Sequence, residues 1–247
     1  MTDDKLAVLI DADNVPYAHV KEMMEEIARN GTPTIKRIYA DWTQPTVSGW
    51  KGVLLENAIT PIQQYSYTTG KNSSDSALII DAMDILYSEK VNGFCIVSSD
   101  SDFTRLATRL REAGMTVIGF GEKKTPKPFI AACNKFIYLE ILRTAKSEPK
   151  PPAKSNKKNQ TRAISDSKVD AETIRIITES VNELADESGW TFLGSLGSYI
   201  LKKQPDFDPR NFGFQKLLPL IKDIKRFEID ERMGGSGNIR LIYLRLK

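Results

Sequence analysis

The sequence predicts an α/β domain, in which helices cover both faces of a mainly parallel sheet, followed by a small domain of helices and a β-hairpin. Three observations predict this organisation. Residues 1–142 alternate short aliphatic segments with segments of helical apolar spacing, which is typical of such sheets. Residues 143–168 are rich in Lys, Pro, Ser and Asn and poor in large apolar residues, as expected for a flexible linker. Residues 169–247 return to helical spacing and close with a hairpin pattern.

The α/β domain is expected to begin with a strand at 6–10, a compact aliphatic run that ends in Asp11. A helix is predicted over 16–30, because apolar residues there repeat at helical spacing and Gly31 closes the pattern. By the same criteria, we expect strands at 35–40, 59–65, 94–97 and 115–120, and helices at 77–87 and 103–113.

The C-terminal domain is predicted to be a winged helix. Helical spacing covers 169–186, 190–201 and a third segment through Leu217 and Ile221. Strands are expected at 227–230 and 239–246, on either side of a glycine-rich turn at 234–238. Three helices and a hairpin make up this fold.

Composition excludes several classes of function. The chain has 247 residues, 40% of them apolar, and its longest apolar runs are of strand length, so we expect a cytoplasmic protein without a membrane span or secretory signal. Cys95 and Cys133 lie in apolar segments without a CxxC motif, which favours reduced thiols in the core. His19 is the single histidine, so a cluster of imidazole ligands is excluded. Any hydrolysis must depend on carboxylates, together with a metal.

The net charge of +3 is unevenly distributed. Residues 1–142 carry 15 basic and 18 acidic side chains, residues 143–168 carry 8 and 2, and residues 169–247 carry 12 and 12. The excess of positive charge therefore lies in the expected linker. That linker is either a solubilising tether or a basic tether that loosely holds nucleic-acid phosphates.

Acidic residues follow two of the predicted strands directly. Because the carboxyl ends of parallel strands share one edge of a sheet, these side chains are expected to converge there. Asp75, at the start of the helix predicted at 77–87, can point to the same edge. The set comprises Asp11, Asp13, Asn14, Asp75, Asp100 and Asp102.

Helix capping is an alternative explanation for each acid taken singly. Capping does not explain Asp11, which ends the strand itself, or the convergence of several acids on one edge. Carboxylates a few ångströms apart raise one another's pKa unless a cation lies among them. Mg²⁺ or Mn²⁺, which prefer oxygen ligands, would suit such a site.

The sequences at 9–14, 71–75 with Asp81, and 97–103 resemble the three motifs of NYN domains, the LabA-like branch of the PIN-like nucleases, over about residues 5–142. The resemblance implies a Rossmann-like PIN sheet and metal-dependent RNA cleavage. It also implies a metal held by Asp11, Asp75 and Asp100 with help from Asp13, Asn14 and Asp102, and a catalytic set of Asp11, Asp75, Asp100 and Asp102. Asp81 is a weaker candidate. Ser99, where members often carry glycine, departs from the pattern, and so does the longer segment between Lys71 and Asp75.

A divalent cation lowers the pKa of a bound water, so this chemistry needs no imidazole base. Asn14, Lys71, Ser99 and Arg105 are the candidates for positioning the substrate, with Lys123 and Lys124 as further phosphate contacts. Ordinary surface charge is the alternative explanation for the cations.

Residues 169–247 resemble the OST-HTH, or LOTUS, domain. The resemblance lies in Trp190, Leu193-Gly194, Leu196-Gly197, Pro205, Phe207, Arg210 and Phe212-Gly213-Phe214. It implies RNA binding, and in some members a protein partner instead. The candidate RNA contacts are Lys202, Lys203, Arg210 and Lys216.

We therefore expect a metal-dependent ribonuclease with a nuclease domain at 1–142, a linker at 143–168 and an RNA-binding domain at 169–247. The expected partners are RNA, a protein bound by the C-terminal domain and a second copy of the chain, and no membrane. An RNA-binding adaptor that does not cleave is the first alternative. A haloacid-dehalogenase-type phosphatase is the second, because residues 11–15 satisfy its D-x-D-x-T/V pattern.

Overall fold

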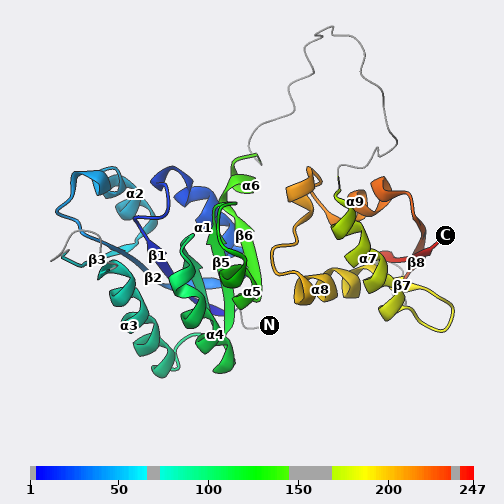
Figure 1. Ribbon diagram of the computed structural model, residues 1–247, viewed down its shortest axis with the longest axis horizontal. Coiled ribbons are helices and arrows are strands. Elements are labelled where there is room, and N and C mark those ends of the chain that lie inside the picture. The colour runs from blue at the N-terminus through cyan, green and yellow to red at the C-terminus, as the bar shows by residue number, and fades with distance from the viewer. Residues whose placement is uncertain (1–3, 66–72, 145–168, 235–239) are drawn as a thin grey trace, which may run out of the picture. The chain divides into compact units, whose positions relative to one another are not determined.

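The computed structural model describes residues 4–65, 73–144, 169–234 and 240–247 (Figure 1). The chain divides into two compact units, residues 1–147 and 148–247. Most of the expected linker lies outside the described residues, and so does Lys71. The predicted domain ends at 142 and 169 therefore remain predictions.

The N-terminal unit is built on a six-stranded parallel sheet with the order β3-β2-β1-β4-β5-β6. Its strands are β1 (Lys5–Asp11), β2 (Thr32–Ala40), β3 (Thr60–Gln63), β4 (Gly93–Val97), β5 (Thr116–Gly121) and β6 (Lys135–Tyr138). The chain runs outward from β1 to β3 on one side and from β4 to β6 on the other. The strand order thus reverses between β1 and β4, which is where ligands bind in sheets of this type.

Helices cover both faces of this sheet, as predicted (Figure 1). The alternation of β1 sends Leu6, Val8 and Ile10 into one apolar core and Ala7 and Leu9 into the other. The first core is completed by α1 (Val20–Ala28), α2 (Trp50–Asn57) and α6 (Leu139–Thr144). The second is completed by α3 (Ser73–Tyr87), α4 (Thr104–Glu112) and α5 (Lys127–Ala132).

The predicted elements of this unit are present with shifted ends. The α-helix expected from residue 16 begins only at Val20, because a 3₁₀ helix, Tyr17–His19, precedes it. The strands expected at 35–40 and 59–65 cover Thr32–Ala40 and Thr60–Gln63. Sequence reasoning missed α2, α5, β6 and α6, which have eight residues or fewer and therefore show little periodicity.

The C-terminal unit has the predicted helices and hairpin. Its helices are α7 (Ala171–Leu184), α8 (Leu193–Lys203) and α9 (Leu217–Ile224), and its antiparallel sheet has the order β7-β9-β8, with β7 (Thr191–Phe192), β8 (Phe227–Met233) and β9 (Arg240–Leu246). The helix expected at 190–201 was wrong at its start, because Thr191 pairs with Leu244 of β9 and donates its hydroxyl to the carbonyl of Val181. Residues 235–238 of the predicted turn and Ile239, the first residue of the predicted strand, lie outside the described residues.

Cys95 and Cys133 are free and buried, as expected. Burial raises the pKa of each thiol to about 12. Among the described helices, none has both the length and the apolar character needed to span a bilayer.

Candidate active site at the carboxyl edge of the sheet

Asp11 ends β1 at the point where the strand order reverses, and it is 1% exposed. Its carboxylate accepts hydrogen bonds from the side-chain amide of Asn14 (2.6 Å), the hydroxyl of Ser98 (2.9 Å) and the backbone N–H of Asp13 (3.2 Å). A buried aliphatic strand thus delivers a carboxylate whose orientation is fixed by neutral donors on both sides.

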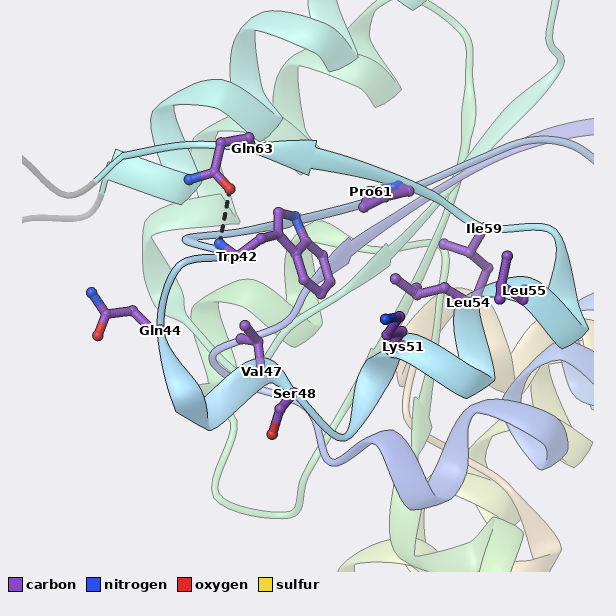
Figure 2. A pocket seen from close by; sticks show the side chains of 10 residues that line it. All are labelled: Trp42, Gln44, Val47, Ser48, Lys51, Leu54, Leu55, Ile59, Pro61 and Gln63. Atoms are coloured by element: carbon purple, nitrogen blue, oxygen red, sulfur yellow. Dashed lines mark hydrogen bonds between the residues drawn. The ribbon is translucent and has the colours of Figure 1, made fainter.

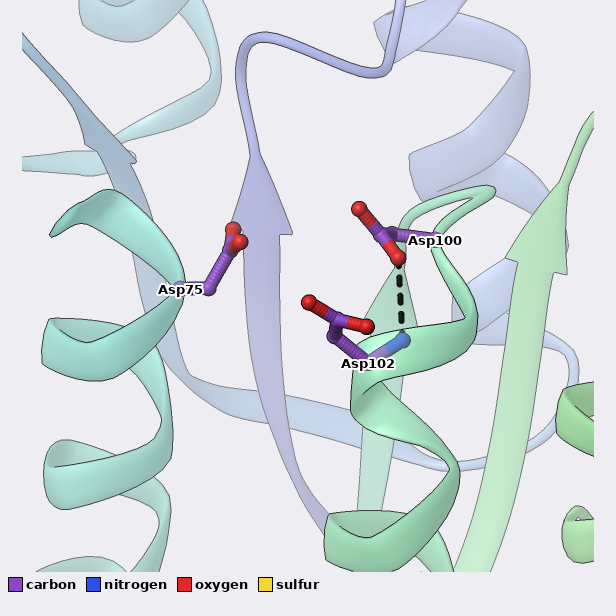
Figure 3. A group of neighbouring side chains, drawn as sticks. All are labelled: Asp75, Asp100 and Asp102. Carbon is purple, nitrogen blue, oxygen red and sulfur yellow. Dashed lines mark hydrogen bonds between the residues drawn. The ribbon is translucent and has the colours of Figure 1, made fainter. Parts of the chain in front are cut away.

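Three further carboxylates meet beside this strand end. Asp75 lies in the first turn of α3, Asp100 follows β4, and Asp102 belongs to the 3₁₀ helix Ser101–Phe103. One carboxylate oxygen of each lies within 4.8 Å of the others (Figure 3). The backbone N–H of Asp102 donates to the carboxylate of Asp100 at 2.9 Å, which fixes that carboxylate relative to Asp102.

The electrostatics of this edge show that like charges are held together. Burial is the largest cause of a rise in the pKa of Asp75 to about 6, and the negative charges of four neighbouring acids add to it. Those neighbours are Asp11, Asp100, Asp102 and Asp13. The five predicted acids therefore contribute to the electrostatics of a single site, although Asp13 is exposed.

Burial also raises the pKa of Asp11, against the hydrogen bonds from Asn14 and Ser98, which lower it. A divalent cation among these carboxylates would offset both the burial and the repulsion. The donor set is made of carboxylate oxygens, which suits hard cations such as Mg²⁺ or Mn²⁺ rather than thiophilic metals. The residues therefore fit a metal of this class.

Comparison with protein-family models identifies the two halves of the chain. The model for the NYN domain matches residues 5–140, and the model for the OST-HTH/LOTUS domain matches residues 165–239. The chain belongs to the NYN domain family. An OST-HTH/LOTUS domain follows the NYN domain, in the order that the sequence predicted.

Three solved structures are similar to parts of the chain. A protein of unknown function from Vibrio parahaemolyticus is 19% identical, covering 54% of this chain and 91% of its own, with a TM-score of 0.47. An uncharacterized protein from Nitrosomonas europaea is 28% identical, covering 40% and 92%, with a TM-score of 0.29. Residues 175–257 of a protein from Chromobacterium violaceum are 30% identical, covering 33% and 87%, with a TM-score of 0.27. No curated protein matches the chain.

Capping explains only part of the acidic edge of the NYN domain. Asp100 does cap the 3₁₀ helix, since it accepts the N–H of Asp102. Asp13 and Asn14 do not cap the next helical segment, whose first residues have no side-chain cap. Asn14 binds Asp11 instead, and Asp13 accepts the hydroxyl of Ser74 at 3.5 Å.

The remaining predicted positions of the NYN domain are dispersed. Ser99 is 7% exposed and accepts the backbone N–H of Glu122 at 2.9 Å, so its hydroxyl braces the loop after β5. Arg105 is exposed on the first turn of α4. Lys124 pairs with Glu122 at 2.6 Å, and the backbone N–H of Lys123 donates to Glu140.

Asp81 serves the fold rather than the acidic edge. Its carboxylate pairs with Arg37 at 2.8 Å and accepts the hydroxyl of Tyr39 at 2.9 Å. Both partners belong to β2, so Asp81 ties α3 to the sheet. Asp84 is exposed on the same helix.

Ser98 is a site residue that sequence reasoning did not assign. Its hydroxyl donates to Asp11 and accepts the backbone N–H of Asp100 at 3.1 Å, so it links the ends of β1 and β4. The signal was present, because Ser98 stands between a buried strand and the acid that follows it.

The four predicted contacts of the LOTUS domain differ in their surroundings. Lys202 and Lys216 are exposed. Lys203 pairs with Glu183 and lies over the ring of Tyr199. Arg210 pairs with Asp208 at 2.6 Å, and the two side chains are only 15% and 12% exposed. The structure therefore gives Arg210 a partner within its own loop.

Proposed function

We propose that this protein is a metal-dependent ribonuclease that cleaves RNA phosphodiester bonds at the acidic edge of its NYN domain, as the LabA-like resemblance implies. The observation that carries the proposal is the convergence of Asp75, Asp100 and Asp102 within 4.8 Å, beside the buried Asp11. The family match supports nuclease chemistry over the phosphatase alternative.

The residues that would hold Mg²⁺ or Mn²⁺ are Asp11, Asp13, Asp75, Asp100 and Asp102. When bound there, such a cation makes water more acidic and offsets the negative charge of a phosphodiester.

The chain's own groups prepare this edge. Asn14 and Ser98 hold Asp11 in one orientation, and the N–H of Asp102 does the same for Asp100. Arg105, three residues beyond Asp102, offers a guanidinium for a flanking phosphate. Lys71 and Ser99 remain proposed positioning residues, Ser99 through the loop that it braces.

The LOTUS domain supports RNA as the substrate. We assign the phosphate contacts of that domain to Lys202, Lys203, Arg210 and Lys216. A protein partner at this domain, a second copy of the chain and a cytoplasmic location complete the proposal.

The test incubates labelled single-stranded and structured RNAs with Mn²⁺ or Mg²⁺. The protein should cleave only with the cation, and Asp11→Asn should not cleave. Asp84→Asn, which changes an exposed acid on α3, is the matched control and should cleave normally. Equal cleavage by the Asp11→Asn protein would indicate a contaminant, and tight binding without cleavage would identify an adaptor. Hydrolysis of a small phosphate ester would support the phosphatase instead.

A further inference from the structure

A hollow of about 630 Å³ lies between the end of β2, helix α2 and strand β3 (Figure 2). This volume is in the range of pockets that hold small organic ligands. All of its lining residues belong to the NYN domain and are described by the structure. None of them belongs to the acidic site.

The lining of the hollow combines three kinds of group. Trp42 supplies an aromatic ring, and Leu54 and Ile59 supply aliphatic surface. Gln44 and Gln63 add side-chain amides, and the nitrogen of each donates to Asp41, at 3.3 and 3.0 Å. A primary amide keeps a second N–H for a ligand. Lys51 is the cation of the described lining, which contains no carboxylate. The lining thus suits an aromatic group that carries a negative charge.

Hydrogen bonds hold the aromatic side of the hollow in place. The indole N–H of Trp42 donates to the carbonyl of Ile62 at 2.9 Å, and its backbone N–H donates to the side-chain oxygen of Gln63 at 3.0 Å. The amide nitrogen of Gln63 donates in turn to Asp41 at 3.0 Å. The ring and the amide are therefore organised before any ligand arrives, which lowers the entropic cost of binding.

One end of the hollow, at Trp42 and Gln63, lies at the same edge of the sheet as the acidic site. Asp11 pairs with Tyr39, and Tyr39 pairs with Ile62, so these residues form one row across β1, β2 and β3. Ile62, whose carbonyl accepts the indole N–H of Trp42, lies two strands away from Asp11. At the usual spacing of parallel strands, this separation is about 10 Å. A single extended chain of nucleotides is long enough to contact both places.

We propose that this hollow binds an unstacked nucleobase of the RNA whose backbone crosses the acidic edge. The inference rests on the proposed ribonuclease function. Single-stranded RNA is commonly held by bases that stack on aromatic side chains while amides contact the base edges. Trp42 is the stacking surface, the amide of Gln63 contacts the base edge through its remaining N–H, and Lys51 contacts a phosphate.

The test measures RNA contact at the hollow without requiring cleavage. All proteins are full-length and carry Asp100→Asn, and the probe is a short single-stranded RNA containing thiouridine. Photo-crosslinks are mapped to peptides, which separates the hollow from the LOTUS domain. Crosslinks are expected on the lining of the hollow.

Two variants and one control decide the outcome. Leu55 lines the hollow and is 80% exposed, so Leu55→Glu places a negative charge at its mouth without disturbing the core. Ile80→Glu makes the same kind of change on α3, where Ile80 is 62% exposed. Leu55→Glu and Trp42→Ala should each lower the crosslink yield in the hollow by about 5- to 150-fold, as expected for loss of one stacked base. Ile80→Glu should match the parent.

The proposal is overturned if Leu55→Glu crosslinks like Ile80→Glu, whether or not Trp42→Ala is affected, because Trp42 also packs against the core. Crosslinks confined to the LOTUS domain would overturn it as well. Cleavage by the protein with Asp100 intact is measured separately with Mn²⁺. Crosslinking that depends on the hollow, without any cleavage, would reject the proposed nuclease function and support the base-binding site.

Discussion

The acidic edge of the NYN domain and the surface of the LOTUS domain use charged side chains in opposite ways. In the NYN domain, five acids act on one locality, and the pKa of Asp75 rises to about 6 as a result of burial and of their charge. In the LOTUS domain, opposite charges lie together, as in Arg210 with Asp208 and Arg245 with Glu228. Ion pairs of this kind stabilise a surface locally. Repelling carboxylates do not, so their retention at one edge points to a ligand that compensates them.

This difference separates residues that stabilise from residues that act. Charges that are satisfied inside their own domain have a structural explanation, which applies to Arg210 and to Asp81. Charges that raise the free energy of the folded state have no such structural explanation. They are explained only when a bound cation or phosphate compensates them. The predictions below test this division.

The largest effect is expected for Asp100→Asn. The change removes one charge from the group that would hold the cation but keeps the shape of the side chain. We expect RNA cleavage to fall by about 10²- to 10³-fold or more, as for the loss of one group that stabilises transition-state charge. Single-turnover cleavage of labelled RNA measures the rate, and binding of the same RNA should be retained. Cleavage at the parental rate would remove Asp100 from the catalytic set.

The second effect is on stability and concerns Arg210. Arg210→Ala leaves Asp208 partly buried without its guanidinium, and we expect the LOTUS domain to lose about 2 kcal/mol of stability. Arg175→Ala is the matched control, because Arg175 pairs with Glu172 and Glu179 at an exposed site, where ion pairs contribute little to stability. Hydrogen exchange in α7 and α8 measures both. Unchanged protection would contradict the stabilising role of the Arg210–Asp208 pair, and weaker RNA binding by the same variant would leave Arg210 with its proposed phosphate contact alone.

The acidic edge could be predicted from sequence because its logic is local. A buried aliphatic run that ends in Asp11 specifies a strand and places its acid at the carboxyl end. The end of β4 places Asp100 in the same way, and the parallel pairing of β1 with β4 brings the two acids to one edge. The position of Ser98 at a strand end is visible in the sequence, but its hydrogen bonds to Asp11 and Asp100 are not, because they depend on how two strand ends distant in sequence meet.

Other features were beyond the reach of periodicity. The segment that forms the hollow contains α2, whose Gly52 and short length weaken the helical pattern although Trp50 and Leu54 are buried one turn apart. Strand β7 has only two residues and exists through its pairing with β9. The sequence shows Asp208 and Arg210 two residues apart, but only the 3₁₀ turn Pro209–Phe212 reveals that they bind each other.

A smaller effect is expected for Asp75→Asn in the absence of divalent cations. The folded-state pKa of Asp75, about 6, lies above its ordinary value of 3.8, so ionisation destabilises the fold as pH rises through this interval. The full shift is worth about 3 kcal/mol, and water at the site screens it to about 1–2 kcal/mol. Asp75→Asn should therefore unfold at a higher temperature than the parent at pH 8.

Two controls bound this effect. The difference should vanish once the pH is well below 3.8, the ordinary pKa of the carboxyl, because the aspartate is then neutral in both states. Asp84→Asn, at an exposed position of the same helix, should leave stability unchanged. Mn²⁺ should stabilise the parent more than Asp75→Asn, because the variant has lost one of the charges that the cation compensates. A parent more stable than the variant at pH 8 without cation would contradict the repulsion.

The smallest effects belong to Lys202 and Lys216, two exposed lysines of the LOTUS domain. If each meets one phosphate, Lys202→Ala and Lys216→Ala should each weaken RNA binding a few-fold and reduce the slope of log affinity against log salt by about 0.7 to 1. Lys203→Ala is the informative comparison, since Lys203 already pairs with Glu183. Contact between Lys203 and RNA should therefore release fewer counterions, and Lys203→Ala should change the slope less. Equal slopes for all three variants would mean that the intradomain pair does not compete with RNA, and that the division between stabilising and acting charges fails in this domain.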